Sequence, residues 1–131
     1  MTQAYLLGID IGTSSIKTVL MDDTGRRRAQ HTYFYETIQR QPGYVEQDPD
    51  GAWWAGTRAG IAACLERSGV HPAEIAGVCA SGMVPNLCPL DREGRPVRPA
   101  ILYRDNRAVE EAAWLKEHLG WESNLQDVTP K

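Results

Sequence analysis

The residues from Leu6 to Asp22 constrain the fold more than any other stretch of the chain. An apolar run ends in Ile9-Asp10-Ile11, a Gly-Thr-Ser-Ser turn follows, and a second apolar-rich run leads to Asp22. Two strand-like patterns joined by so short a turn predict a hairpin. Asp10 is unusual in a structural strand, because burying an unpaired carboxylate costs free energy. The adjacent turn offers backbone N–H groups and three hydroxyls, which would suit a phosphate and its metal ion.

Length and composition predict one soluble globular domain. The chain has 131 residues, of which 42% are hydrophobic and 24% charged, with a formal net charge of −3. Without a basic excess, neither nucleic acid nor a membrane surface is expected as a partner. The N-terminal sequence shows no pattern of a signal peptide or membrane span, so we expect a cytoplasmic protein. Three cysteines without metal-ligand spacing predict free thiols, with Cys64 and Cys79 as small buried hydrophobes.

The strand patterns predict a mixed sheet. Residues 5–11, 15–22 and 29–38 read as three successive strands with short turns, an antiparallel meander. Residues 75–81 read as a fourth strand, which should run parallel to an earlier one because a helix precedes it. Residues 86–91 read as an edge strand, since Pro89 cannot donate a ladder hydrogen bond.

Two helices are predicted. The first runs from Pro49 to Ser68, with Asp48 as its N-cap and Gly69 as the residue that ends it. Its apolar face should comprise Trp54, Ile61 and Leu65, and both Trp53 and Trp54 should pack in the core or between domains. The Glu-Gln-Asp run at 46–48 should mainly set the helix start. The second helix follows residue 107 and ends at Gly120, with an apolar stripe of Ala108, Ala112, Leu115 and Leu119. The order β-β-β-α-β-β-α defines an α/β fold.

The turn from Asp10 to Lys17 is a candidate phosphate site. Gly12 permits close approach of backbone N–H groups to phosphate oxygens, and Thr13, Ser14 and Ser15 add hydroxyl groups. Asp10 can hold magnesium through water, because magnesium keeps several waters and takes few carboxylates. No Gly-Lys-Ser/Thr opens a helix, and the second element is a strand pattern, so neither a Walker loop nor a dinucleotide fingerprint fits. By itself the turn fits a plain polar hairpin equally well.

Three further stretches make the chain resemble the FGGY carbohydrate kinases. They are Gly43-Tyr44-Val45-Glu46-Gln47-Asp48-Pro49 with Trp53-Trp54, then Ile75-Ala76-Gly77-Val78, then the run from Leu90 to Ala108. The similarity covers about Leu6 to Ala108 in the family's order. It implies a ribonuclease H-like mixed sheet of the actin, hexokinase and heat-shock protein 70 superfamily. Residues 1–131 would be part of the N-terminal domain.

The resemblance implies an ATP-dependent kinase that transfers the γ-phosphate to a sugar or polyol hydroxyl with Mg²⁺. Gly12, Thr13, Ser14 and Lys17 would then bind phosphate, and Asp10 would hold the metal through water. The general-base Asp and the adenosine site of the family lie later than residue 131. The resemblance therefore implies no catalytic residue in this chain, and it implies that the chain alone is inactive.

The same resemblance places the substrate pocket at two segments. Met83 and Val84 belong to the loop 82–86, and Tyr103, Asp105 and Arg107 form an aromatic-x-Asp-x-Arg segment. A carboxylate and a guanidinium can bind sugar hydroxyls, and a ring can pack on a sugar's C–H face. Taken singly, Asp105 could instead cap the following helix, and Arg107 could form a surface ion pair.

Departures from the family pattern bear on the substrate. Xylulokinase-like members carry a Gln-Met-His type loop where this chain has Met83-Val84-Pro85, and glycerol kinases carry Trp at the position of Tyr103. The expected partners are a sugar or polyol and the remainder of the kinase chain, and the resemblance also allows a homodimer. An alternative is a non-catalytic, truncated kinase-like module that acts in binding or assembly. Another ATPase of the actin-like superfamily fits less well, because the 91–107 segment is a sugar-side signature.

Overall fold

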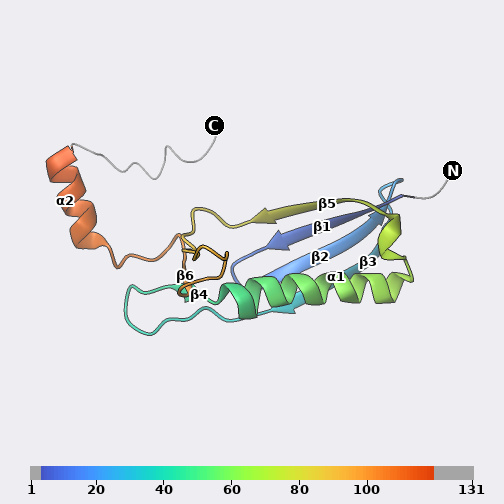
Figure 1. The fold of residues 1–131 in the computed structure, drawn as a ribbon, viewed down its shortest axis with the longest axis horizontal. Coiled ribbons are helices and arrows are strands. Elements are labelled where there is room, and N and C mark those ends of the chain that lie inside the picture. The colour runs from blue at the N-terminus through green and yellow to red at the C-terminus, as the bar shows by residue number, and fades with distance from the viewer. Residues whose placement is uncertain (1–3, 120–131) are drawn as a thin grey trace.

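The structure is a computed structural model that describes residues 4–119. A four-stranded sheet and one long helix form its main body, and a two-stranded ladder lies beside them (Figure 1). The elements in chain order are β1 (Tyr5–Ile11), β2 (Ser15–Asp22), β3 (Arg27–Phe34), β4 (Glu46–Gln47), a π-helical segment (Pro49–Trp54), α1 (Ala55–Ser68), a 3₁₀ turn (Pro72–Glu74), β5 (Ile75–Gly82), β6 (Ala100–Ile101) and α2 (Val109–Leu119).

The main sheet has the order β3-β2-β1-β5, with β1 antiparallel to β2 and parallel to β5. This confirms the predicted meander, the crossover and the strands at 5–11, 15–22 and 75–81. The third strand was predicted too far along the chain, at 29–38. Phe34 pairs with Ser15, the first residue of β2, so β3 has no partner strand beyond that point.

Side chains alternate between the two faces of this sheet. Those of Tyr5, Leu7 and Ile9 are buried, whereas those of Leu6 and Asp10, on the alternate positions, are exposed. The buried face of the sheet packs against α1, mainly through β2 and β3. The opposite face is open, and it forms the groove described below.

The first helix begins and ends as predicted, but its buried face is different. Asp48 accepts a hydrogen bond from the backbone N–H of Asp50, and Gly69 ends the helix with φ +69°. The residues of α1 that face the sheet are small, namely Gly56, Thr57, Gly60 and Cys64. Of the predicted apolar face, Ile61 is partly buried and packs against the core and Leu65 is partly buried, but Trp54 is 60% exposed, so its predicted core position was wrong. Close contact with the sheet requires small residues, a signal that apolar periodicity does not contain.

The predicted edge strand at 86–91 does not form. Only isolated bridges join Leu87 to Ile101 and Leu90 to Pro96. Pro89 has no N–H to donate to a ladder, and a turn follows at residues 91–95, where Asp91 accepts hydrogen bonds from the backbone N–H groups of Glu93 and Arg95.

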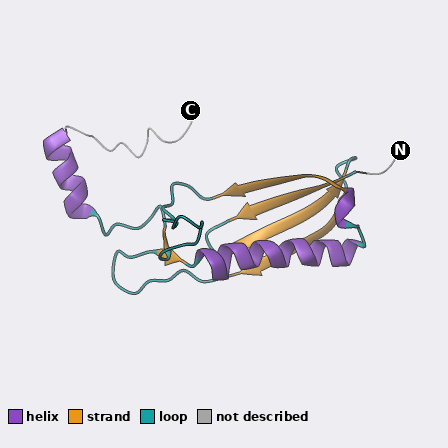
Figure 2. Cartoon of the chain, in the orientation of Figure 1, coloured by secondary structure: helices purple, strands orange, loops and turns teal. Residues whose placement is uncertain are grey.

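The second helix forms at Val109–Leu119, so Ala108 precedes it, and the predicted stop at Gly120 lies outside the described residues. None of its residues is buried, so the apolar stripe has no packing partner within the described part of the chain. The helix extends away from the sheet (Figure 2).

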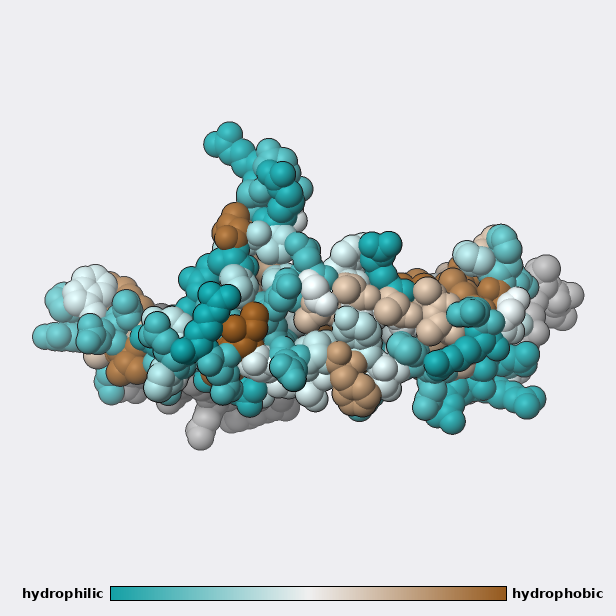
Figure 3. Space-filling view, turned by 90° about the horizontal axis from the view of Figure 1, so that it is seen from below, coloured by the Kyte–Doolittle hydropathy of each residue, from teal (hydrophilic) through white to brown (hydrophobic). Residues whose placement is uncertain are grey.

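Seen from the side of α1, hydrophobic residues form small separate patches among hydrophilic ones (Figure 3). Cys64 is buried as predicted, but Cys79 is exposed, because β5 is an edge strand and Cys79 lines the open face. Within residues 4–119, no helix combines the length and the apolar character needed to cross a bilayer.

Candidate functional site

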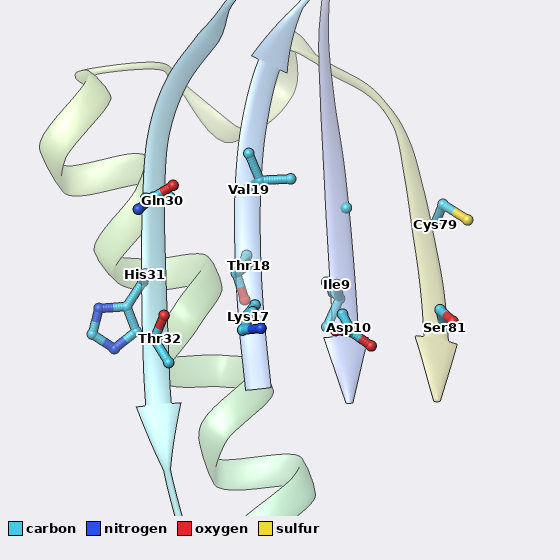
Figure 4. A pocket seen from close by; sticks show the side chains of 11 residues that line it. Ile9, Asp10, Lys17, Thr18, Val19, Gln30, His31, Thr32, Cys79 and Ser81 are labelled. Carbon is cyan, nitrogen blue, oxygen red and sulfur yellow. The ribbon is translucent and has the colours of Figure 1, made fainter. Parts of the chain in front are cut away.

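Asp10 lies at the carboxyl end of β1, on the open face of the sheet. It is exposed and stands directly opposite Lys17 of β2 and next to Ser81 of β5 in the strand register. Figure 4 shows these three side chains at the same end of a groove of about 540 Å³. A carboxylate, an ammonium and a hydroxyl therefore lie side by side on three neighbouring strands.

The turn after β1 holds its own carbonyl groups away from the surface. The Gly12 carbonyl accepts from the Tyr35 hydroxyl, the Thr13 carbonyl from Gln47 Nε2 at 2.5 Å, and the Ser14 carbonyl from the Tyr35 backbone N–H at 3.1 Å. Burial, and secondly the nearby Asp10 carboxylate, raise the pKa of Tyr35, so its hydroxyl remains a donor.

The backbone N–H groups of Thr13 and Ser14 form no hydrogen bond within the described part of the chain. The Gly12 N–H closes the turn onto the Ser15 carbonyl, and a Cβ on Gly12 would lie 3.2 Å from that oxygen. Two adjacent free N–H groups beside Lys17 are the donors that an anionic phosphate group would need.

The same end of the groove fits a hydrated magnesium ion. Residues 4–119 contain no cluster of three or more His, Cys, Asp or Glu side chains placed to hold a metal. A hydrated ion needs no such cluster, because Mg²⁺ usually binds through one or two carboxylates, several waters and phosphate oxygens. Asp10 is exposed and can supply such a carboxylate.

The predicted sugar-side residues come together at the end of β5. The backbone N–H of Met83 donates to the Ile11 carbonyl at 3.2 Å, which places the loop 83–86 next to residues 12–15, the candidate phosphate turn. The Asn86 side chain then joins this loop to Tyr103, since its Nδ2 donates to the Met83 carbonyl and its Oδ1 accepts from the Tyr103 N–H, both at 2.9 Å. Val84 and Tyr103 are 79% and 46% exposed.

Asp105 and Arg107 are paired with protein groups. Arg107 donates to both carboxylate oxygens of Asp105, at 2.8 and 2.6 Å, and the backbone N–H groups of Val45 and Arg107 donate to the same two oxygens. The hydrogen bonds from Arg107 outweigh burial and hold the pKa of Asp105 far below its ordinary value. The guanidinium of Arg107 also lies 3.9 Å from the centre of the Tyr44 ring.

Sequence reasoning missed the roles of Glu46 and Gln47. Both side chains are buried in β4, where Glu46 accepts from Arg98 and Arg107, and Gln47 contacts the phosphate turn. Burial raises the pKa of Glu46, but the two arginines outweigh it, so the net shift is downward. The signal in the sequence is a Glu-Gln pair immediately before the helix cap Asp48, a pattern that by itself predicts only the start of the helix.

Comparisons with known proteins identify the family of the chain. Residues 5–130 match the N-terminal domain of the FGGY family of carbohydrate kinases. The chain is 37% identical over 123 residues to the xylulose kinase of Staphylococcus xylosus, covering 94% of this chain and 25% of that protein. It is 34% identical over 131 residues to the glycerol kinase of Burkholderia vietnamiensis, covering 98% and 26%.

A solved structure shows the same fold. The crystal structure of xylulose kinase from Rhodospirillum rubrum superposes with a TM-score of 0.77 and 30% identity, over 88% of this chain and 23% of that one. The predicted ribonuclease H-like fold of the actin and hexokinase superfamily is confirmed. The chain spans about a quarter of the length of these relatives. The described fold and the match over residues 5–130 together show that the chain belongs to the FGGY family of carbohydrate kinases.

Proposed function

We propose that this chain supplies the phosphate-binding residues, and some of the sugar-binding residues, of an ATP-dependent carbohydrate kinase. The kinase would act in the cytoplasm, where ATP is available. The observation that carries the proposal is the turn 12–15. Its carbonyls are held by Tyr35 and Gln47, while the N–H groups of Thr13 and Ser14 stay free beside Lys17 and Asp10. The kinase activities named for the relatives support it.

In the proposed reaction, an acceptor hydroxyl oxygen forms a bond to the γ-phosphorus of ATP. The bond to the oxygen that bridges the β- and γ-phosphates breaks, ADP leaves, and a general base takes the hydroxyl proton. Thr13, Ser14 and Lys17 would hold phosphate oxygens, and Asp10 would hold Mg²⁺ through water. The ion would neutralise charge that develops on the phosphate oxygens. We assign no residue of this chain as the base.

At the sugar end, we propose that Met83, Val84 and Tyr103 face the acceptor. They are adjacent in space through Asn86, and Val84 and Tyr103 are exposed. Asp105 and Arg107 belong to the same end, and their bonds to Val45 and Glu46 support a contribution through the shape of the pocket. The substrate class we propose is a sugar, sugar acid or polyol with a free hydroxyl.

The experiment is a coupled assay of ADP release by the protein translated from the complete reading frame, with pentuloses, polyols and sugar acids as acceptors. We expect sugar-dependent release with one class and none without Mg²⁺. The first 131 residues expressed alone should give no turnover with any acceptor. Absence of release by the complete protein with every class would overturn the kinase proposal and favour a binding or assembly module.

A further inference from the structure

The two residues of β4 connect different parts of the site. Glu46 and Gln47 are adjacent, and only 5% and 0% of their surfaces are exposed. Successive side chains of a strand point to opposite sides, and these two make their hydrogen bonds in opposite directions. Gln47 contacts the phosphate turn, and Glu46 contacts the segment that contains Tyr103.

The amide of Gln47 has defined partners. Its Nε2 donates to the Thr13 carbonyl at 2.5 Å and to Thr37 Oγ1 at 3.3 Å, and its Oε1 accepts from Trp53 Nε1 at 2.7 Å. The Trp53 N–H can only donate, so it fixes the orientation of the Gln47 amide with the oxygen toward Trp53. The amide nitrogen then faces the Thr13 carbonyl and donates to it. With its carbonyl held inward, the peptide that joins Thr13 to Ser14 turns its N–H outward.

The carboxylate of Glu46 fixes the other end. Its Oε1 accepts hydrogen bonds from Arg98 at 2.6 Å and from Arg107 at 2.9 Å, and Arg107 also donates to the Asp105 carboxylate. Backbone bonds reinforce this link, since the Val45 N–H donates to Asp105 and the Leu102 N–H donates to the Val45 carbonyl at 2.9 Å. Tyr103 follows directly on Leu102.

We propose that Gln47 is a positioning residue for the phosphate-binding turn and that Glu46 is a positioning residue for the acceptor-binding segment, an inference that rests on the proposed function. Strand β4 would then set the spacing between the bound phosphate and the acceptor. Neither side chain would touch a substrate. Phosphoryl transfer depends on such spacing, because small misplacements of reacting groups cost large factors in rate.

The test compares Gln47→Met with Gln41→Met, which changes an exposed glutamine. Methionine retains the unbranched shape and loses both hydrogen-bonding functions. In Gln47→Met, the backbone amides of Gly12 and Tyr35, whose bonds close the turn, should exchange hydrogen about tenfold faster. The KM for ATP should rise, or kcat fall, by about 10- to 100-fold, with the KM for the acceptor unchanged.

Glu46→Gln should instead raise the acceptor KM and leave exchange at Gly12 unchanged.

A second variant separates positioning from loss of folding. Gln47→Met leaves the Trp53 N–H unpaired, and Gln47→Met/Trp53→Phe removes that donor as well. The double variant should therefore be more stable than the sum of the two single changes predicts, while the faster exchange at Gly12 and Tyr35 persists.

Unchanged exchange in Gln47→Met, or equal changes in both KM values, would overturn the proposal. Exchange is measured by mass spectrometry on the complete protein and needs no activity. A protein that releases no ADP would therefore refute the kinase function and still show whether Gln47 orders the turn.

Discussion

At the residue scale, Asp10 differs from the other side chains of β1. Leu7 and Ile9 are buried against the helix side, whereas Asp10 faces the open groove opposite Lys17 and beside Ser81. Its carboxylate therefore avoids the cost of burial that made it unusual in the sequence. An exposed carboxylate in contact with solvent can reach a hydrated cation.

Asp10→Ala should lower kcat/KM for ATP-dependent phosphorylation by about 100-fold or more, because it removes charge positioning at the transferred phosphate. Binding of the acceptor should change little. Steady-state kinetics and calorimetric titration of the acceptor measure the two effects. Asp23→Ala, in the exposed turn after β2, is the matched control. Equal turnover in Asp10→Ala and wild type would remove Asp10 from the site.

Asp105 makes a residue-scale contribution to stability that depends on pH. Arg107 lowers its pKa in the folded protein below the ordinary value of 3.8. A lowered folded-state pKa means that this stability is fully present above about pH 4 to 5 and is lost as the pH falls further. The unfolded chain takes up the proton first, which favours unfolding.

Asp105→Asn should therefore destabilise the protein by about 1.5–3 kcal/mol at pH 7. It should also reduce the loss of stability between pH 5 and pH 3. Urea unfolding at a series of pH values measures both, with Asp23→Asn as the control. An unchanged pH dependence would contradict the assignment of this ion pair to folding stability.

At the element scale, the contact of α1 with β2 rests on small residues. A Cβ on Gly60 would overlap Thr18 Oγ1, and a Cβ on Gly56 would lie 2.6 Å from the Tyr33 ring. The Thr18 hydroxyl is buried and has no hydrogen-bond partner in the described residues. The helix therefore approaches the sheet closely at these two glycines, and the position of α1 on the sheet depends on them.

Gly60→Ala should destabilise the protein by about 1–3 kcal/mol through overpacking, although alanine favours helix more than glycine does. Thr18→Ala removes the hydroxyl oxygen, the atom that a Cβ on Gly60 would meet first, and leaves only the Cβ opposite, so the double variant Gly60→Ala/Thr18→Ala should recover part of the loss. A double-mutant cycle on thermal unfolding provides the measurement. Strict additivity would show that the two positions are not in contact.

At the scale of the whole molecule, one face of the sheet is covered by α1 and the other is open. The carboxyl ends of β1 and β5 point toward the β4–β6 ladder, so the candidate phosphate turn and the candidate sugar-side loop, residues 83–86, meet there (Figure 1). Cys79 of β5 lies on the open face, whereas Cys64 of α1 is buried in the core between α1 and the covered face. Burial raises the pKa of the Cys64 thiol, which further lowers its reactivity.

A thiol-reactive dye should therefore label Cys79 in the folded 131-residue chain at least about tenfold faster than Cys64. Labelling of Cys64 should require denaturant. Peptide mass spectrometry identifies the sites, and Cys79→Ala provides the control. Fast labelling of Cys64 under native conditions would contradict the packing of α1 on the sheet.

The sequence alone determined the parts of the fold that depend on local patterns. Strands β1, β2 and β5, the helix cap at Asp48 and the end at Gly69 follow from periodicity and capping, which act over a few residues. The positions of the candidate phosphate and sugar residues followed from the family resemblance. The proximity of the loop 83–86 to the turn 12–15 follows from β1 and β5 being parallel neighbours.

Only the tertiary structure decided which face α1 buries, that residues 86–91 form isolated bridges instead of a strand, and that β4 joins the two ends of the candidate site. The contacts of Gln47 with Thr13 and of Glu46 with Arg107 span 34 and 61 positions in the chain. A glutamine beside a helix cap has the same local pattern whether or not a distant carbonyl reaches it. Such long-range hydrogen bonds depend on how whole elements pack, and local propensity carries no information about them.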